Sequence, residues 1–358
     1  MSKLLMVDIG AGTMDVLYHD GESGRHYKAV VKSPVLYLAE MVAGLKGNLL
    51  ITGCEMGGGP ISKALTERAK EAEVIMSVSS AATIHHNLEK VRSFGIKVIE
   101  DSEADWLRQH KAPNHLTIGD LELDRLKQIV DGFGVSFEFD VVGICAQDHG
   151  VPPRGMSHLD YRHSLFRASL DENPFPNVLL YRGDEVPKTL NRLTSIAESA
   201  KAFPVDEVYV MDSGMAAILG ASQDLQVTSK EKVLILDVAT SHTLGAAIEG
   251  DEIDGFFEYH THDISLGRLE SLLVELADGK LDHKQILQEG GHGAYKRKAF
   301  GFPNVEVIVA TGPKRNLVEN SRFPIVMGSP FGDNMMTGTV GLLEAIRQRK
   351  GLDQIRYL

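Results

Sequence analysis

The chain has 358 residues, of which 43% are hydrophobic and 24% are charged, as in an ordinary globular protein long enough for two domains. It has 37 Lys and Arg residues against 49 Asp and Glu residues, and the resulting formal net charge of −12 disfavours nucleic acids and anionic membranes as partners. Two cysteines are too few for a disulfide framework or a four-sulfur metal site, and we recognise neither a leader nor a membrane-spanning run, so we expect a cytoplasmic protein.

Residues 3–31 have the pattern of three strands separated by glycine-rich or Asp-Gly turns. Beyond them, segments with helical and strand periodicity alternate, which is typical of an α/β protein. The expected helices are 33–44, one beginning at 60, 80–95, 120–134, 187–202, 214–222, 265–277 and 333–350. The expected strands are 3–9, 14–19, 26–31, 48–53, 73–78, 135–146, 206–212, 232–239, 243–250, 252–260 and 305–312.

The first turn belongs to the segment VDIGAGTMD, residues 7–15. A dinucleotide-binding motif or a P-loop requires a helix directly after its glycines, whereas a strand follows here, so the glycines lie at a hairpin tip. Backbone N–H groups at such a tip can hold an anion, and an acid at the end of the strand can hold Mg²⁺ through water. The candidate anion donors are Gly10, Ala11, Gly12 and Thr13, and the candidate Mg²⁺ residue is Asp8. The alternative is an ordinary tight hairpin.

A second hairpin of the same form occurs in LDVATSHTLGAAI, residues 236–248. It places Asp237 at the end of a strand and Thr240, Ser241 and His242 at the tip. Three further segments flank it: MDSGMAAILG at 211–220, ATGPKR at 310–315 and DNMMTGTVGLLEA at 333–345.

With these five segments the chain resembles the actin-like ATPase superfamily, which contains sugar and acetate kinases, actin and heat-shock chaperones. In chain order they are similar to its phosphate 1, connect 1, phosphate 2, adenosine and connect 2 motifs. The resemblance implies an α/β fold with two ribonuclease H-like, actin-type domains around a nucleotide cleft, with ATP and Mg²⁺ as cofactors. It places domain I at 1–222 plus 333–358, with a large insertion at about 33–205, and domain II at 223–332.

The resemblance also implies roles for single residues. Asp8 and Asp237 match the two acids that hold Mg²⁺ through water, and Gly312 matches the adenosine motif. Asp212 falls where the superfamily often has the general base, but an aspartate at the start of a helix can equally be its cap. In the second hairpin, Ala239-Thr240-Ser241 stands where many members have three glycines, so either hydroxyls replace some N–H contacts there or hydrolysis has been lost.

The chain further resembles a narrower family commonly labelled pyruvate formate-lyase activating enzymes. The segments that carry this likeness are TGCEMGGGP, AATIHHNLEKVRSFG, QDHGVPPRG and the two hairpins. A radical activating enzyme of that kind needs three cysteines for its iron–sulfur cluster, and this chain has two, so we do not expect that reaction.

Two loops follow buried strands and are therefore expected to line a ligand crevice. The first offers close backbone approach before the helix at Pro60, through Glu55, Gly57, Gly58 and Gly59. The second offers Gln147, Asp148 and His149, as an acid/base pair or as substrate contacts. The alternatives are a tight strand-to-helix turn and a polar loop fixed by its prolines. His260 and His262 alternate near the end of a strand and could share a metal ion, but the sequence offers no third ligand and a solvated or capping role competes.

These observations favour a Mg²⁺-dependent ATP-binding protein, a phosphotransferase or ATPase that acts on an unidentified small molecule or partner. The alternative is a non-catalytic nucleotide sensor or activator. The sequence leaves the phosphate acceptor and the oligomeric state open, a dimer being one option.

Overall fold

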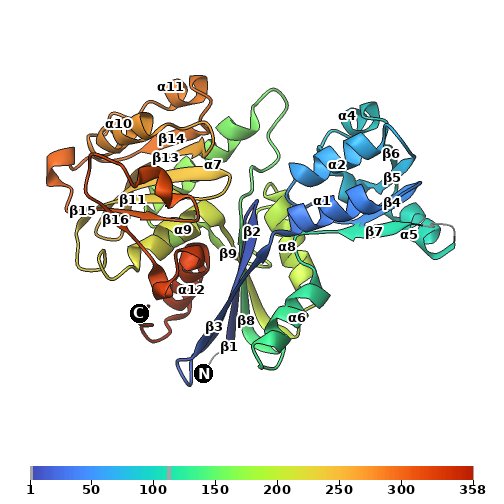
Figure 1. Ribbon diagram of the computed structural model, residues 1–358, viewed down its shortest axis with the longest axis horizontal. Coiled ribbons are helices and arrows are strands. Elements are labelled where there is room, and N and C mark those ends of the chain that lie inside the picture. Colours follow the sequence, from blue (N-terminus) through green and yellow to red (C-terminus); the bar gives the residue numbers. More distant parts are fainter. Residues whose placement is uncertain (1–2, 111–113, 358) are drawn as a thin grey trace.

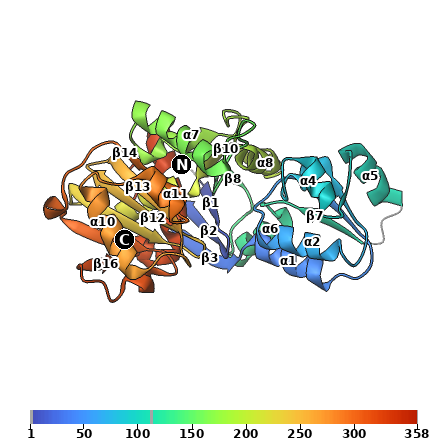
Figure 2. The ribbon, with the colours of Figure 1, turned by 90° about the horizontal axis from the view of Figure 1, so that it is seen from above.

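The computed structural model describes residues 3–110 and 114–357. The ends of the predicted domain ranges, residues 1–2 and 358, and residues 111–113 of the predicted insertion lie outside the described residues. Three sheets lie side by side, with the first between the other two (Figures 1 and 2).

The first sheet has six strands in the order β3-β2-β1-β8-β10-β9. Its first three strands form an antiparallel meander, β8 and β10 run parallel to β1, and β9 is an antiparallel edge strand. Their bounds are β1 Lys3–Ile9, β2 Thr13–Asp20, β3 His26–Lys32, β8 Phe139–Ala146, β9 Leu180–Arg182 and β10 Val205–Asp212.

The second sheet repeats this arrangement in the order β14-β13-β12-β11-β15-β16. Again two antiparallel strands follow the first one, and a parallel strand, β15, lies on its other side. The bounds are β11 Lys232–Val238, β12 His242–Glu249, β13 Glu252–His260, β14 Gly293–Lys296, β15 Val307–Thr311 and β16 Ile325–Met327. This duplicated strand order is the ribonuclease H-like arrangement of actin-type domains, and it confirms the predicted fold class.

The third sheet is parallel throughout, in the order β6-β5-β4-β7, and lies in the chain between β3 and β8. Its elements are α1 Pro34–Gly44, β4 Leu49–Gly53, α2 Pro60–Arg68, β5 Val74–Ser77, α3 Val78–Ala81, α4 Leu88–Ser93, β6 Lys97–Ile99, α5 Asp101–His110 and β7 His115–Ile118. Strands β8 and β9 fall within the range given to the insertion, yet they pair in the first sheet. The apolar run of β8 is buried there between β1 and β10.

The remaining helices cover the two six-stranded sheets. Two helices, α6 and α8, pack on one face of the first sheet, α10 packs on the second sheet, and α9 and α12 lie between the two sheets (Figure 1). The bounds are α6 Leu123–Gly132, α7 His158–Glu172, α8 Asn191–Ala200, α9 Ser213–Ser222, α10 Leu266–Ala277, α11 His283–Gln288 and α12 Thr337–Lys350. Within the described ranges, none of the helices has the length and apolar character needed to cross a bilayer.

Helices α9 and α12 cross with their backbones in contact. A Cβ atom built on Gly220 would lie 1.8 Å from the carbonyl oxygen of Thr337, and one built on Gly341 would lie 1.8 Å from that of Ala216. Only glycine fits at these two positions. The crossing lies in the core that joins β1 of the first sheet to β11 of the second.

The predicted helix 80–95 is wrong as a single element. It forms two short helices, α3 and α4, because the side chain of Asn87 accepts a hydrogen bond from the N–H of Glu89 and caps α4. The last helix begins at Thr337 instead of 333, because Asp333 caps a short 3₁₀ turn that precedes it.

Candidate functional site

A cleft of about 770 Å³ is lined by the ends of β1 and β11, both hairpin tips, the loops after β4 and β8, and the start of α12. The cleft brings together all the predicted site residues except Asp212. Those that line it are Asp8, Gly10, Ala11, Gly12, Thr13, Glu55, Gly57, Gly58, Gly59, Gln147, Asp148, His149, Asp237, Thr240, Ser241, His242 and Gly312.

Asp8 and Asp237 occupy equivalent places in the two sheets. Each lies near the end of the central strand, opposite Cys145 of β8 and Thr311 of β15 respectively. Burial raises the pKa of Asp8 to about 7, with the charge of Asp237 also raising it, and burial raises the pKa of Asp237 to about 6. Among the described residues neither carboxylate has an ion-pair partner, so two acids face the cleft without a cation in contact.

Glycine packs closely against each of these acids. A Cβ on Gly338, in the first turn of α12, would lie 2.0 Å from Oδ2 of Asp8. Gly312 has φ of +86°, and a Cβ there would lie 2.6 Å from the carbonyl oxygen of Val238 and 2.9 Å from Oδ1 of Asp237. A side chain at either glycine would therefore collide with the acid beside it.

The two hairpin tips have the same local geometry and meet in the cleft. The N–H of Gly10 donates to the carbonyl of Thr13 at 3.0 Å, and the N–H of Ala239 donates to that of His242 at 3.0 Å. A Cβ built on Gly12 would lie 2.8 Å from Cγ2 of Thr240. The threonine that replaces a glycine in the second tip therefore fills the space directly beside Gly12.

Asp212 is engaged in structure. Its Oδ1 accepts hydrogen bonds from the N–H groups of Gly214 and Met215, which caps α9, and its Oδ2 accepts one from Arg162 at 2.7 Å. Burial raises its pKa, although the nearby Arg162 charge opposes this. Of the two roles predicted for Asp212, these contacts match the helix cap, and we do not assign it the role of general base.

Arg162 and Glu258 are cleft residues that the sequence analysis missed. Arg162 on α7 lies 3.6 Å from Glu258 on β13 and also donates to the carbonyl of Asp148 at 2.7 Å. Burial opposes the charge of Glu258, but Arg162 and then His292 outweigh it and hold the pKa of Glu258 well below its usual range. No local motif marks either residue, since Arg162 lies in a helix that we did not expect and Glu258 lies near the end of an ordinary strand.

The loop after β8 is fixed by its own hydrogen bonds. The two oxygens of Asp148 accept from the N–H groups of Gly150 at 2.7 Å and Leu193 at 3.0 Å. Burial lowers the pKa of His149 to about 3, so this ring is neutral. Gln147 donates to Glu258 of the second sheet. This is the geometry of a fixed polar loop that contacts a cleft ligand, and the two groups are not arranged as an acid/base pair.

A buried ion pair connects the loop after β4 to α8, the helix that packs on the first sheet. Asp120 is bound by Arg192 through two hydrogen bonds of 2.8 Å and also accepts from the N–H of Gly57 at 3.3 Å. Glu55 pairs with His86 at 2.9 Å, and this hydrogen bond raises the pKa of the imidazole. These contacts fix the position of the glycines, whose backbone lines the cleft.

His260 and His262 do not form a pair directed at one point. His262 lies in the turn after β13 with 76% of its side chain exposed, and its ring centroid is 5.3 Å from that of His260, which in turn contacts His242 and His292. The sequence could not supply His292, because it lies 32 residues after His260 and outside any recognisable motif.

The duplicated strand order, with an acid near the end of each central strand and a shared cleft, is the arrangement of the actin-like ATPase fold. Solved structures that cover nearly the whole chain at low identity include a ROK hexokinase from Thermus thermophilus (13% identity, 98% of this chain and 99% of that chain, TM-score 0.32). Others are the PilM–PilN type IV pilus biogenesis complex (11%, 98% and 99%, TM-score 0.39) and MreB5 of Spiroplasma citri bound to ADP (10%, 97% and 96%, TM-score 0.34). A search of curated proteins gave no match. The chain belongs to the family described as "Putative pyruvate format-lyase activating enzyme (DUF1786)", whose model matches residues 56–317.

Proposed function

We propose that the chain binds Mg²⁺-ATP in the cleft and transfers or hydrolyses the terminal phosphoryl group, with a small molecule or partner as acceptor. The observation that carries this proposal is the pair of acids, Asp8 and Asp237, which reach one cleft from equivalent strand ends and have no ion-pair partner in the part of the chain that the structure describes. Bound Mg²⁺ would neutralise phosphate charge between them.

The chain's own groups have separate tasks in this proposal. The N–H groups of Ala11 and Gly12 at the tip donate to phosphate oxygens, Gly10 closes the tip through its bond to Thr13, and the Thr13 side chain adds a hydroxyl. Asp8 and Asp237 are carboxylate ligands of the kind that Mg²⁺ accepts, directly or through water. The loops around Gly57 and Gln147 line the same cleft, and we assign them to the second substrate.

The activity in the family description is not part of this proposal. An iron–sulfur cluster is held by deprotonated cysteines, and the sequence contains two cysteines. Cys145 is buried beside Asp8, and burial raises the pKa of its thiol well above the usual value. That side chain is a core thiol and is not poised as a metal ligand.

Replacement of either acid by its amide tests the proposal. We expect Asp8→Asn and Asp237→Asn to lower Mg²⁺-dependent ATP turnover by about 100-fold or more while leaving the circular-dichroism spectrum unchanged. Asp251→Asn, in the exposed turn between β12 and β13, is the matched control and should keep wild-type turnover. Wild-type turnover in both cleft variants would contradict the proposal.

A nucleotide sensor is the second candidate, and two observations favour it. Thr240 fills the space beside Gly12, and Asp212 is held by Arg162 and by its capping bonds. A sensor would gain thermal stability from ATP or ADP with Mg²⁺ and show no turnover above background. Turnover that disappears in Asp8→Asn would exclude this candidate.

A further inference from the structure

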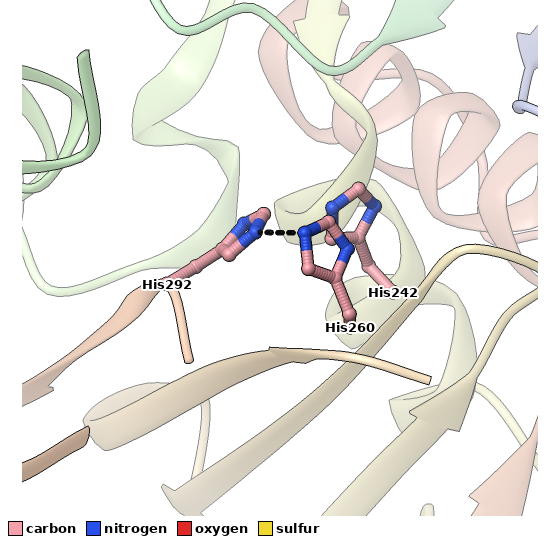
Figure 3. Close-up of side chains that lie close together, drawn as sticks. All are labelled: His242, His260 and His292. Carbon is pink, nitrogen blue, oxygen red and sulfur yellow. Dashed lines mark hydrogen bonds between the residues drawn. The ribbon is translucent and has the colours of Figure 1, made fainter. Parts of the chain in front are cut away.

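Three histidine rings lie close together (Figure 3), and all three line the cleft. His242 begins β12, His260 ends β13 directly opposite it, and His292 precedes β14. The Nε2 atoms of His260 and His292 are 3.0 Å apart. One ring nitrogen from each of the three residues lies within 4.8 Å of those of the other two.

A metal ion binds the lone pair of a neutral imidazole, and each of the three rings offers one such nitrogen to a common position.

The hydrogen bonds of the cluster are incomplete. Nε2 of His242 and Nδ1 of His292 are buried without a hydrogen-bond partner. Nδ1 of His242 lies 2.7 Å from Oγ of Ser241, so a proton on Nδ1 that is donated to the serine leaves the Nε2 lone pair free. A buried polar atom without a partner is costly, and a metal ion would satisfy it.

A carboxylate lies behind the cluster, as is common around metal-binding histidines. Oε1 of Glu258 is 3.7 Å from Nδ1 of His292. The same carboxylate forms an ion pair with Arg162 and accepts a hydrogen bond from Gln147. A small shift of the ring would let Nδ1–H donate to Glu258 while Nε2 binds metal.

We propose that His242, His260 and His292 form a binding site for a divalent first-row transition metal such as Zn²⁺. Three imidazoles suit such ions, whereas Mg²⁺ prefers oxygen ligands, so this site is chemically distinct from the one at Asp8 and Asp237. Two nitrogens bound to one Zn²⁺ at about 2.0–2.1 Å are roughly 3 Å apart, close to the spacing of the His260 and His292 nitrogens. Since all three residues line the cleft, the open coordination position is available to an oxygen donor of a cleft ligand.

The test measures metal binding to the chain purified without a polyhistidine tag and freed of metal by a chelator. Calorimetric titration with Zn²⁺, without nucleotide, should give one equivalent per chain, and Co²⁺ should give the visible absorption of a nitrogen-bound, low-coordinate ion. His260→Ala and His242→Ala should each weaken Zn²⁺ binding by about 10-fold or more. The control is His262→Ala, two residues from His260 and exposed, which should bind as the wild type does.

Two results would overturn the inference: no binding by the wild type, or equal binding by the wild type and His260→Ala. Either would mean that the rings are only hydrogen-bonded to one another. If a variant fails to fold by circular dichroism, the Co²⁺ spectrum of the wild type still decides, because a six-coordinate, water-like spectrum contradicts a three-histidine site. None of these readouts depends on ATP, so the site stands or falls separately from the proposed function.

Discussion

The backbone contact between α9 and α12 predicts an unusual response to the mildest substitution, Gly341→Ala. In most helices this exchange is stabilising by up to about 1 kcal/mol, because alanine has the higher helix propensity. At Gly341 the new Cβ would lie 1.8 Å from the carbonyl oxygen of Ala216 and 2.6 Å from the backbone nitrogen of Gly220.

The magnitude follows from these distances. Cβ atoms essentially never lie closer than 3.0 Å to such neighbours, so the helices must separate by at least about 1.2 Å. The blocking atoms belong to backbone and cannot move to another rotamer. Overpacking of a core costs about 1–3 kcal/mol and occasionally more, and we expect a net loss of about 3 kcal/mol because the whole crossing must shift.

The control is the same exchange in a helix with free space. A Cβ on Gly267, in α10, meets nothing within 4 Å, so Gly267→Ala should leave stability unchanged or raise it. Urea unfolding followed by circular dichroism, and thermal melts, should place the Gly341→Ala midpoint well below and the Gly267→Ala midpoint at or above that of the wild type. A Gly341→Ala midpoint equal to the wild-type value would refute the close crossing.

Three further predictions concern charge and space in the cleft. Arg162→Met leaves Asp212 and Glu258 buried without their cation and should cost about 3–5 kcal/mol in urea unfolding. Arg182→Met breaks only an exposed pair with Asp184 and should leave the unfolding midpoint close to that of the wild type. Similar losses in the two variants would contradict the buried network. Burial, and then the charge of Asp8, raise the pKa of Asp15 to about 8 from 3.8. Between these pH values the folded chain holds a proton that the unfolded chain releases. The free energy of unfolding therefore falls with rising pH, by about 1.4 kcal/mol per pH unit from this group. Urea unfolding at pH 5.5 and 7.5 without Mg²⁺ measures this slope, and Asp15→Asn should remove the part that comes from Asp15. Identical slopes in the wild type and the variant would contradict the raised pKa of Asp15. Thr240→Gly frees the space beside Gly12 and should raise affinity for ATP several-fold in a Mg²⁺-containing thermal-shift titration, while unchanged affinity would show that the threonine is no obstacle.

The two acid hairpins could be predicted because their signal is local. A strand that ends in an acid, a short tip and a returning strand are all written within a dozen residues, and the same pattern occurs at Asp8 and at Asp237. The fold was predicted from the order of five segments along the chain, two of which are these hairpins.

Other parts of the site depend on contacts that no short segment contains. His292 and Arg162 reach the cleft from separate elements, and their partners are brought near only by the packing of the two sheets. Asp212 was ambiguous for a different reason, since an aspartate between a strand and a helix has the same sequence whether it caps the helix or contacts substrate. The helix predicted across Asn87 failed because a capping side chain outweighed the apolar periodicity.

Arg162 connects the two six-stranded sheets on one side of the cleft. On this side the guanidinium joins α7 to Asp212 of the first sheet and to Glu258 of the second, so a rotation that parts the two sheets here would leave buried charges without partners. The loops of the third sheet also line the cleft, but among residues 3–110 and 114–357 no ion pair connects this sheet to the second one. Separation of the third sheet from the second would therefore break no ion pair among these residues, whereas separation of the two six-stranded sheets would break those of Arg162.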